Sequence, residues 1–500
     1  MQTGKSERTM SNENKINSTT IRMSELLYLC FFCIMLFAKG IGLYDGQNIY
    51  KLFLVVAFLC IAIKMCITEY TYREWGIILF LLMLSTIVYL VSGEKGVLIC
   101  MVTVTAMKNV SLHRAFRVGL VVWSVAMGGR FFISLMHIEN VFTEVQIKNI
   151  TGAVMRYFMG YPHPNTLHIS YLVLAALVIY CVKETYGLKH LLILATGNLF
   201  VFFYSYSFTG ALIVIIYICL SYCVSKRTIS KAEYFLVRLF FPFCILFSII
   251  FPLTLSGRVY ELADKIFNNR INFARHFLTV DNMSLLGNNL AAITTNILTM
   301  DNAFIFALVT YGILIFLLVC VAYVTVVSQY VNERKNIELA MICCFLAAGI
   351  TEPFLFNTSF KNLTLLFIGE LLFQVLCKNK SGQKEIAVFR NRDRYITFST
   401  EKWQKVSEEL HKLWTVYSRI ILGVSCIAAV IISACVGFFY QHRPEILKKQ
   451  MLKQQMDNLL FFERIRVVVT AFVLGFVTAV IVIGAALKVV DGKWRINGEK

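Results

Sequence analysis

Long apolar runs recur along this chain and are separated by short polar connectors. Each run is about 17 to 25 residues long, which is enough for an α-helix to cross a hydrocarbon core roughly 30 Å thick. The runs lack the polar–apolar alternation of a barrel strand, and in lipid a helix satisfies its own backbone polar groups. The pattern therefore predicts an all-α, polytopic bundle of about 12–14 transmembrane helices. The expected spans are residues 26–43, 50–68, 74–92, 97–111, 117–136, 167–182, 189–205, 208–224, 235–255, 303–328, 339–356, 361–377, 416–440 and 467–488.

Lysine and arginine gather in every second connector. With the polar residues 1–25 taken as a cytoplasmic tail, the basic connectors are 69–73, 108–116, 183–188, 225–234, 329–338 and 378–415. The short connectors on the other side contain a single basic residue, Lys95. Positive loops mark the cytoplasmic side, so this asymmetry predicts the orientation. It places two long polar loops, 137–166 and 256–302, on the outer face.

Composition supports the same class of protein. The chain is 58% hydrophobic and 15% charged, which excludes a soluble globular protein, and it has a formal net charge of +19. Because the positive charges lie in connectors, we expect anionic membrane lipid and phosphorylated lipid as partners, and no nucleic acid. The fifteen cysteines fall almost entirely in apolar runs, without metal-site spacing, and are interpreted as small buried hydrophobes. Neither a metal nor a cofactor is expected.

The chain divides by pattern into a transmembrane core at 26–377, a charged cytoplasmic segment at 378–415 and a two-span appendage at 416–500. The basic stretch 441–466 would lie outside under this orientation, against the rule that fixes it. Either one span is miscounted, or this stretch is an amphipathic helix on the membrane surface.

The loop 256–302 combines charge and length in a way that no other part of the core does. It carries Arg258, Arg270 and Arg275 between two apolar runs. A guanidinium is planar, permanently charged and able to bind phosphate oxygens through two parallel hydrogen bonds, so these arginines are candidate substrate-binding residues. The alternative is that they anchor the loop at the membrane interface or pair with its own carboxylates.

Three further constellations carry candidate chemistry at the outer face. Asp301 and Asn302 begin a span and could act as general base and sugar ligand, or could cap the helix. His163 and Asn165 belong to a rigid turn with two prolines, which could orient both side chains or only start a helix. Glu352 lies at the edge of a span, where a carboxylate is expected to be functional or to pair with an arginine.

These motifs occur in an order similar to that of a known family. His-Pro-Asn-Thr-Leu-His opens one span, Ser-Gly-Arg-Val opens the long loop, and Leu286-Gly287-Asn288, Asp301-Asn302 and Tyr311-Gly312 follow. This order resembles the Wzy-type O-antigen, capsular and exopolysaccharide repeat-unit polymerases of bacteria. The resemblance covers residues 26–377.

The resemblance implies a fold like that of the GT-C-type polymerases and ligases, in the plasma membrane of a bacterium. It implies a metal-independent glycosyltransferase that joins undecaprenyl-diphosphate-linked oligosaccharide repeat units at the outer face. Arg258 would contact the diphosphate, with Asn165 and Asn302 as further substrate ligands. Arg270 and Arg275 are substrate-binding candidates from their position in the loop and not from the resemblance, because Arg270 lacks the glycine that follows eleven residues after such an arginine in some members. Asp301, Glu352 and His163 are the candidates for the catalytic base. A flippase and a chain-length regulator of the same pathway are the implied protein partners.

Two other functions fit the same architecture. A flippase for lipid-linked oligosaccharides should show charged residues at mid-membrane and two related halves, and neither feature is evident in this sequence. A ligase that transfers a finished glycan to a different acceptor, as O-antigen ligases do, has the same general features as a polymerase. Both remain alternatives.

Overall fold

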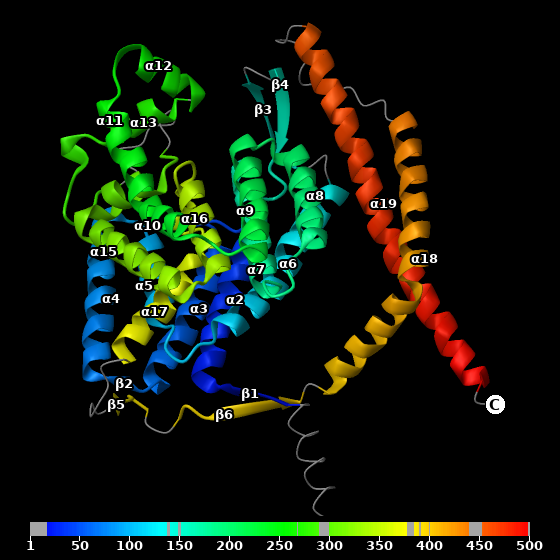
Figure 1. The fold of residues 1–500 in the computed structure, drawn as a ribbon, viewed down its shortest axis with the longest axis horizontal. Helices are drawn as coiled ribbons and strands as arrows, with labels where there is room; N and C mark the ends of the chain where they lie inside the picture. Colours follow the sequence, from blue (N-terminus) through cyan, green and yellow to red (C-terminus); the bar gives the residue numbers. More distant parts are fainter. Residues whose placement is uncertain are drawn as a thin grey trace, which may run out of the picture. The chain divides into compact units, whose positions relative to one another are not determined.

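The fold was analysed in a computed structural model of the chain. It describes residues 18–137, 141–148, 152–267, 269–289, 300–377, 385–389, 392–399, 401–439 and 453–498. Helices dominate, and Figure 1 shows most of them running side by side. Residue contacts divide the chain into two compact units, residues 23–141 with 158–394 and residues 1–22 with 142–157 and 395–500.

The larger unit is a helical bundle. Its membrane-length and shorter helices are α2 (Met23–Gly40), α3 (Asn48–Ile67), α4 (Tyr72–Ser92), α5 (Gly96–Thr105), α6 (Leu112–Met136), α7 (Pro164–Cys181), α8 (Leu188–Ser205), α9 (Phe208–Lys226), α10 (Lys231–Ile245), η2 (Leu246–Ile250), α11 (Phe251–Thr254), α12 (Gly257–Ile266), α13 (Arg270–Phe277), η3 (Val280–Asn282), α15 (Ala303–Glu333), α16 (Asn336–Gly349), η4 (Pro353–Leu355) and α17 (Thr364–Cys377). Strands β2 (Tyr70–Thr71) and β5 (Glu385–Ile386) pair at one end of this bundle, and α12 and α13 lie at the other (Figure 1).

The prediction of a multi-pass helical bundle is confirmed. Among the described residues, eleven helices are long and apolar enough to cross a membrane, and α5, α16 and α17 are shorter apolar helices. Each of the expected spans coincides with one of these helices, although several boundaries differ. The expected span 339–356 stops early, because α16 ends at Gly349 and Glu352 precedes Pro353, a residue that disfavours helix in its predecessor.

Helix α7 forms the centre of the bundle and is buried along most of its length. The indole nitrogen of Trp123 in α6 donates to the carbonyl oxygen of Ser170 at 2.9 Å. The buried imidazole of His168 contacts Ser205 Oγ at 2.9 Å and Asn198 Oδ1 at 2.8 Å, both on α8. A buried polar group needs such partners, so these contacts fix the position of α7 against its neighbours.

Helix α15 is broken at Gly312, whose φ of 80° and ψ of 173° are not helical. The segment around Gly287 fills the gap: Ile313 N donates to Ser284 O at 3.0 Å, and Asn288 N donates to Val309 O at 3.1 Å. Backbone polar groups freed at membrane depth must find partners inside the protein, and this segment provides them. Two of the sequence motifs therefore contact each other in the fold, namely Leu286-Gly287-Asn288 and Tyr311-Gly312.

Helix α12 lies on the surface of the bundle and has no buried residue. Val259, Leu262 and Ile266 are 62%, 62% and 67% exposed on one side of it. Two neighbours on the adjacent side, Arg258 and Lys265, are also exposed. An exposed apolar stripe beside a charged one is typical of a helix that lies in the membrane interface.

Buried charge joins several helices at the end opposite to α12. Lys108 Nζ binds Glu74 Oε2 at 2.7 Å and the carbonyl oxygen of Glu69 at 2.6 Å, and both charged side chains are almost fully buried. Lys64 Nζ donates to the carbonyl oxygen of Lys108 at 3.1 Å. Helix α5 ends at Thr105 and not at 111 as expected, and Asn109, next to Lys108, has a left-handed φ of 62°.

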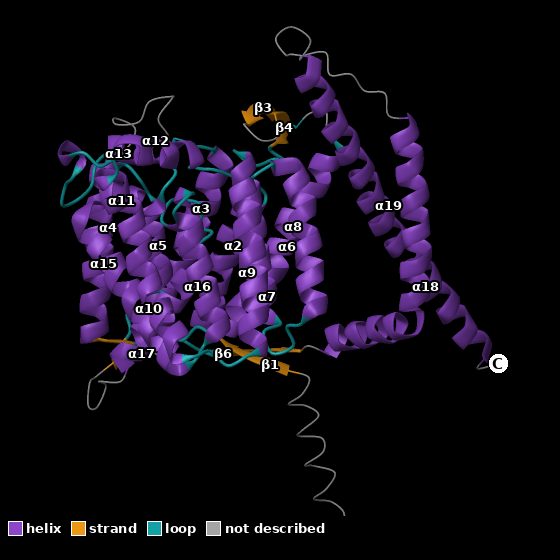
Figure 2. Ribbon diagram, turned by 45° about the horizontal axis from the view of Figure 1, so that its top comes forward, coloured by secondary structure: helices purple, strands orange, loops and turns teal. Residues whose placement is uncertain are grey.

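The smaller unit consists of strands β1 (Ser18–Arg22), β3 (Thr143–Lys148), β4 (Gly152–Tyr157) and β6 (Tyr395–Ser399) and of helices α18 (Glu401–Phe439) and α19 (Lys453–Gly498). The two helices pack on each other, and β1 pairs antiparallel with β6. Figure 2 colours the strands orange and the helices purple. The hairpin β3–β4 belongs to the loop 137–166, and Arg466 of α19 donates to the carbonyl oxygen of Met155 at 2.8 Å. Of the basic stretch 441–466, residues 441–452 lie outside the described residues and 453–466 form the first part of α19.

Candidate functional site

Asn302 starts helix α15 and ties it to two other elements. Its side-chain oxygen accepts from Phe304 N at 2.9 Å and Ile305 N at 3.1 Å, the capping geometry that an N-cap residue needs. Its amide nitrogen donates to Ser248 Oγ at 2.9 Å and to the carbonyl oxygen of Ile350 at 3.0 Å. All four bonds are internal to the protein. Asn302 therefore positions its neighbour Asp301 at a junction of η2, α15 and the end of α16.

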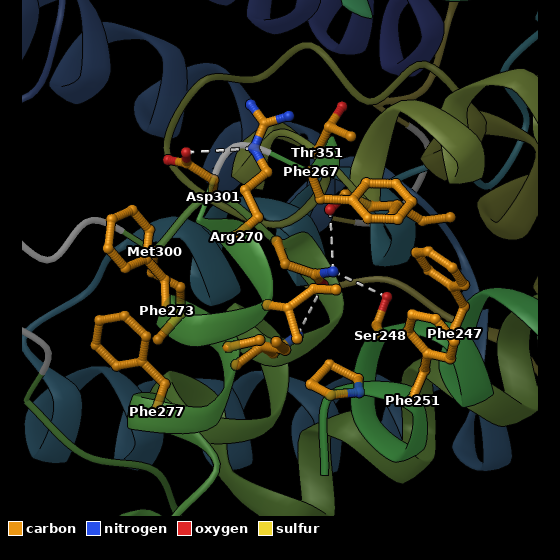
Figure 3. Close-up of a pocket in the computed structure, with 16 residues that line it drawn as sticks. Phe247, Ser248, Phe251, Phe267, Arg270, Phe273, Phe277, Met300, Asp301 and Thr351 are labelled. Atoms are coloured by element: carbon orange, nitrogen blue, oxygen red, sulfur yellow. Dashed lines mark hydrogen bonds and ion pairs between the residues drawn. The ribbon is translucent and has the colours of Figure 1, made fainter. Parts of the chain in front are cut away.

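Arg270 lies between two carboxylates from different segments. It begins α13, following Asn269 in a left-handed conformation. Its Nε is 3.6 Å from Asp301 Oδ2, and its Nη2 is 3.7 Å from Glu352 Oε1. Figure 3 shows the guanidinium extending toward the Asp301 carboxylate. Both separations are longer than a hydrogen bond and lie within ion-pair distance.

Glu352 connects this pair to the Pro-His-Pro-Asn turn. The side-chain nitrogen of Asn165 donates to Glu352 Oε1 at 2.7 Å, a contact between residues 187 positions apart. Asn165 is the second residue of α7, and His163 caps the same helix by accepting from Asn165 N through Nδ1 at 3.2 Å. Asp301, Arg270, Glu352 and Asn165 therefore form one polar chain across four segments.

A cavity adjoins this chain of residues and is mostly aromatic. Its ring-bearing walls are Phe247, Phe251, Phe267, Phe273 and Phe277, and its polar walls are Ser248, Arg270, Asp301, Asn302 and Thr351. Figure 3 shows the labelled side chains among them converging from η2, α11, α13 and the segments that follow α12 and α16 and precede α15. The volume of this cavity is about 40 Å³, so it is a small hollow beside the polar residues and not a preformed site for a whole substrate.

The two other arginines of the long loop behave differently. Arg275 donates from Nε to the carbonyl oxygen of Pro252 at 2.5 Å and from a terminal nitrogen to that of Leu255, and its guanidinium lies 4.0 Å from the centre of the Tyr260 ring. Arg275 thus holds α11 and α13 together. Arg258 is exposed on α12 and is not among the residues that line the cavity.

Lys361 is a buried cation beside this site that the sequence analysis missed. It is 2% exposed, and its Nζ donates to the carbonyl oxygen of Thr166 at 3.0 Å. Burial and, to a smaller extent, the charge of Lys39 lower the pKa of Lys361 to about 7, against the opposing effect of the Glu352 carboxylate. Its ammonium also lies 5.4 Å from the centre of the Tyr161 ring. The one available signal was a lysine at the edge of an apolar run, which is costly unless the residue has a role.

Metal chemistry has no obvious site in the part of the chain that the structure describes. Its His, Cys, Asp and Glu residues form no group of three or more that could hold an ion. The paired carboxylates of the site, Asp301 and Glu352, share a guanidinium between them instead. What the arrangement offers chemically is a cation for an anionic group, carboxylates for a proton and an amide for a hydroxyl.

The chain matches no protein family, no curated protein and no solved structure in comparisons with each. The described fold defines the class, a multi-pass helical membrane protein with a polar site at one end of the bundle.

Proposed function

We propose that this protein is a membrane-embedded glycosyltransferase that polymerises lipid-diphosphate-linked oligosaccharide repeat units at the outer face of a bacterial plasma membrane. The observation that carries the proposal is the convergence of Asn165, Arg270, Asp301 and Glu352 at the predicted outer end of the bundle. Such a reaction needs a cation for the leaving diphosphate and a base for the acceptor hydroxyl. The order of the sequence motifs, which resembles that of the Wzy-type polymerases, supports the same reaction.

In this proposal the acceptor hydroxyl attacks the anomeric carbon of the donor glycan. A new C–O bond forms, the bond to the lipid diphosphate breaks, and the diphosphate leaves with the electron pair. Arg270 stabilises the charge that develops on it, having exchanged a carboxylate contact of about 3.6 Å for phosphate oxygens. Asp301 takes the hydroxyl proton, since its carboxylate is 37% exposed and lines the cavity.

Glu352 and Asn165 have a positioning role in this scheme. Glu352 is the less exposed carboxylate, at 18%, and its Oε1 already accepts from Asn165. It contacts Arg270 through Nη2, next to the Nε that faces Asp301, and Asn165 donates to Glu352. A misplacement of the guanidinium by about 1 Å can reduce the rate on the order of 100-fold, so both residues should matter without touching substrate.

The test is a gel of glycans from cells that lack the protein and are complemented with single variants. Arg270→Ala should leave single repeat units, because removing a donor to a developing charge typically costs about 100- to 1,000-fold in rate. Arg258→Ala is the matched control: it removes an arginine from the same loop, at an exposed position, and should retain a ladder. Asp301→Asn should resemble Arg270→Ala. Immunoblots of membranes verify that each variant is inserted.

Three outcomes contradict the proposal in different ways. A full ladder from Arg270→Ala removes the polar chain from the mechanism. Single units from Arg258→Ala together with a ladder from Arg270→Ala move the diphosphate contact to α12. Repeat units that stay at the cytoplasmic face of cells without the protein indicate a flippase.

A further inference from the structure

A second polar cavity lies at the opposite end of the bundle from the candidate site. It has a volume of about 500 Å³ and lies between the start of α10 and the end of α15. Helix α15 begins next to Asp301 and ends at Glu333, so the two sites are at opposite ends of one helix. The cavity is lined by Thr228, Ile229, Lys231, Tyr234, Arg238, Val331, Asn332, Arg334 and Asn336.

The lining of this cavity is cationic. It contains Lys231, Arg238 and Arg334 and no carboxylate. The carboxylates next to it in the chain are engaged elsewhere: Glu233 pairs with Arg227, and Glu333 pairs with Lys335 at 2.8 Å. Three cations without an anion in the lining favour a ligand that carries negative charge.

Two side-chain hydrogen bonds connect the walls of this cavity, and one of them positions Arg238. Arg238 Nη2 donates to Asn332 Oδ1 at 2.8 Å, and the Tyr234 hydroxyl donates to Asn336 Oδ1 at 2.8 Å. The first bond joins α10 to the end of α15 and the second joins α10 to the start of α16, so both connect the cavity walls. The Asn332 bond uses one of the five N–H donors of the Arg238 guanidinium, which leaves the others for phosphate oxygens.

The neighbouring surface of α10 is apolar and exposed. Phe235 and Leu236 are 59% and 64% exposed, and Leu239 is 45% exposed, within the span that runs from Lys231 to Thr254. A ligand whose charged group sits in the cavity would therefore have hydrocarbon directly beside it. A free phosphate ion makes no contact with this apolar surface, whereas the acyl chains of a phospholipid can pack on it.

We propose that this cavity binds the headgroup phosphate of an anionic phospholipid, with the acyl chains along Phe235, Leu236 and Leu239. Lys231, Arg238 and Arg334 bind the phosphate, and the hydroxyl and amide groups of the lining bind the remaining headgroup oxygens. Basic pockets between transmembrane helices on the cytoplasmic side are a known form of lipid recognition. The site is independent of the glycosyltransferase proposal.

The test uses the purified full-length protein in neutral detergent, with fluorescent phosphatidylglycerol as the probe. Binding should be saturable, unlabelled phosphatidylglycerol should compete, and phosphatidylcholine should compete at least tenfold less well. A triple variant should bind phosphatidylglycerol on the order of 100-fold more weakly; it combines Lys231→Gln, Arg238→Gln and Arg334→Gln. Each cation near a membrane surface contributes about fivefold in affinity, so three contribute about 100-fold. The affinity of Arg238→Lys for phosphatidylglycerol should stay within tenfold of that of the unmodified protein, because this substitution keeps the positive charge.

The matched control is a second triple variant that removes three positive charges on the same predicted side of the membrane. Arg73→Gln, Arg117→Gln, Lys189→Gln changes three exposed residues that do not line the cavity and should bind phosphatidylglycerol normally. The proposal is overturned if this control loses as much affinity as the cavity variant, or if phosphatidylcholine competes equally. It is also overturned if millimolar inorganic phosphate displaces the lipid, because the site then recognises free phosphate.

Discussion

The contact between Gly287 and Gly312 allows a quantitative prediction about stability. A Cβ added to Gly287 would overlap the carbonyl of Thr310, with the carbonyl carbon at 2.6 Å, where carbon atoms normally approach to about 3.5–4.0 Å. Gly287 also has a φ of +88°, a conformation that costs an L-residue about 1–2 kcal/mol. Forcing extra volume into a packed backbone contact adds typically about 1–3 kcal/mol.

Gly287→Ala should therefore lower the free energy of unfolding by about 2–5 kcal/mol. Gly46→Ala separates the two contributions, because Gly46 has a φ of +104° but nothing within 4 Å of an added Cβ. This control should lose only the backbone part, about 1–2 kcal/mol. Thermal and denaturant-induced unfolding of both variants in detergent measures the difference. Equal losses for Gly287→Ala and Gly46→Ala would refute the idea that the two glycines meet.

Two further predictions concern buried lysines. Lys108→Met leaves Glu74 buried without its partner and should destabilise the protein by about 3–5 kcal/mol in the same assay, whereas Lys95→Met breaks a pair with Asp45 that is about 30% exposed and should cost at most about 1 kcal/mol. For Lys361, with a pKa of about 7 when folded and about 10.4 when unfolded, the unfolded chain binds more protons between these values, so stability should rise with pH there. From pH 7.5 to 9 the unmodified protein should gain about 2 kcal/mol more than Lys361→Met, and equal slopes would exclude this ionisation.

Hydrophobic patterning was sufficient for the class of the fold and for the position of most helices. It failed where the chain leaves the helix for reasons other than polarity. The stretch after Gly349 is as apolar as a span, yet it turns at Pro353 and presents Glu352. The break in α15 at Gly312 was equally hidden, because a glycine inside an apolar run is compatible with a continuous helix until its partner at Gly287 is known.

The candidate site was predictable by residue but not by arrangement. Asn165, Asp301 and Glu352 were selected from their positions at span ends and Arg270 from the long polar loop, and the structure brings these four together. Local patterns could not rank Arg270 above Arg258, because both are arginines in one polar loop. The difference lies in tertiary contacts, since one arginine faces two carboxylates and the other is exposed on α12. Lys361 escaped notice because it was counted as part of a span.

The exposed apolar stripe on α12 has a consequence for how a substrate would reach Arg270. A helix of this kind sinks its apolar side about 5–10 Å into the boundary between headgroups and acyl chains. Asp264 of α12 fixes α13 to this level, because its Oδ1 accepts from Asn272 N at 2.9 Å and its carbonyl accepts from Asn269 N at 2.9 Å. A position of α12 in the interface would therefore hold Arg270 at headgroup depth. Under the proposed function, a lipid-anchored substrate at that depth would arrive by lateral diffusion in two dimensions, so turnover should follow its surface density in the leaflet and not its bulk concentration.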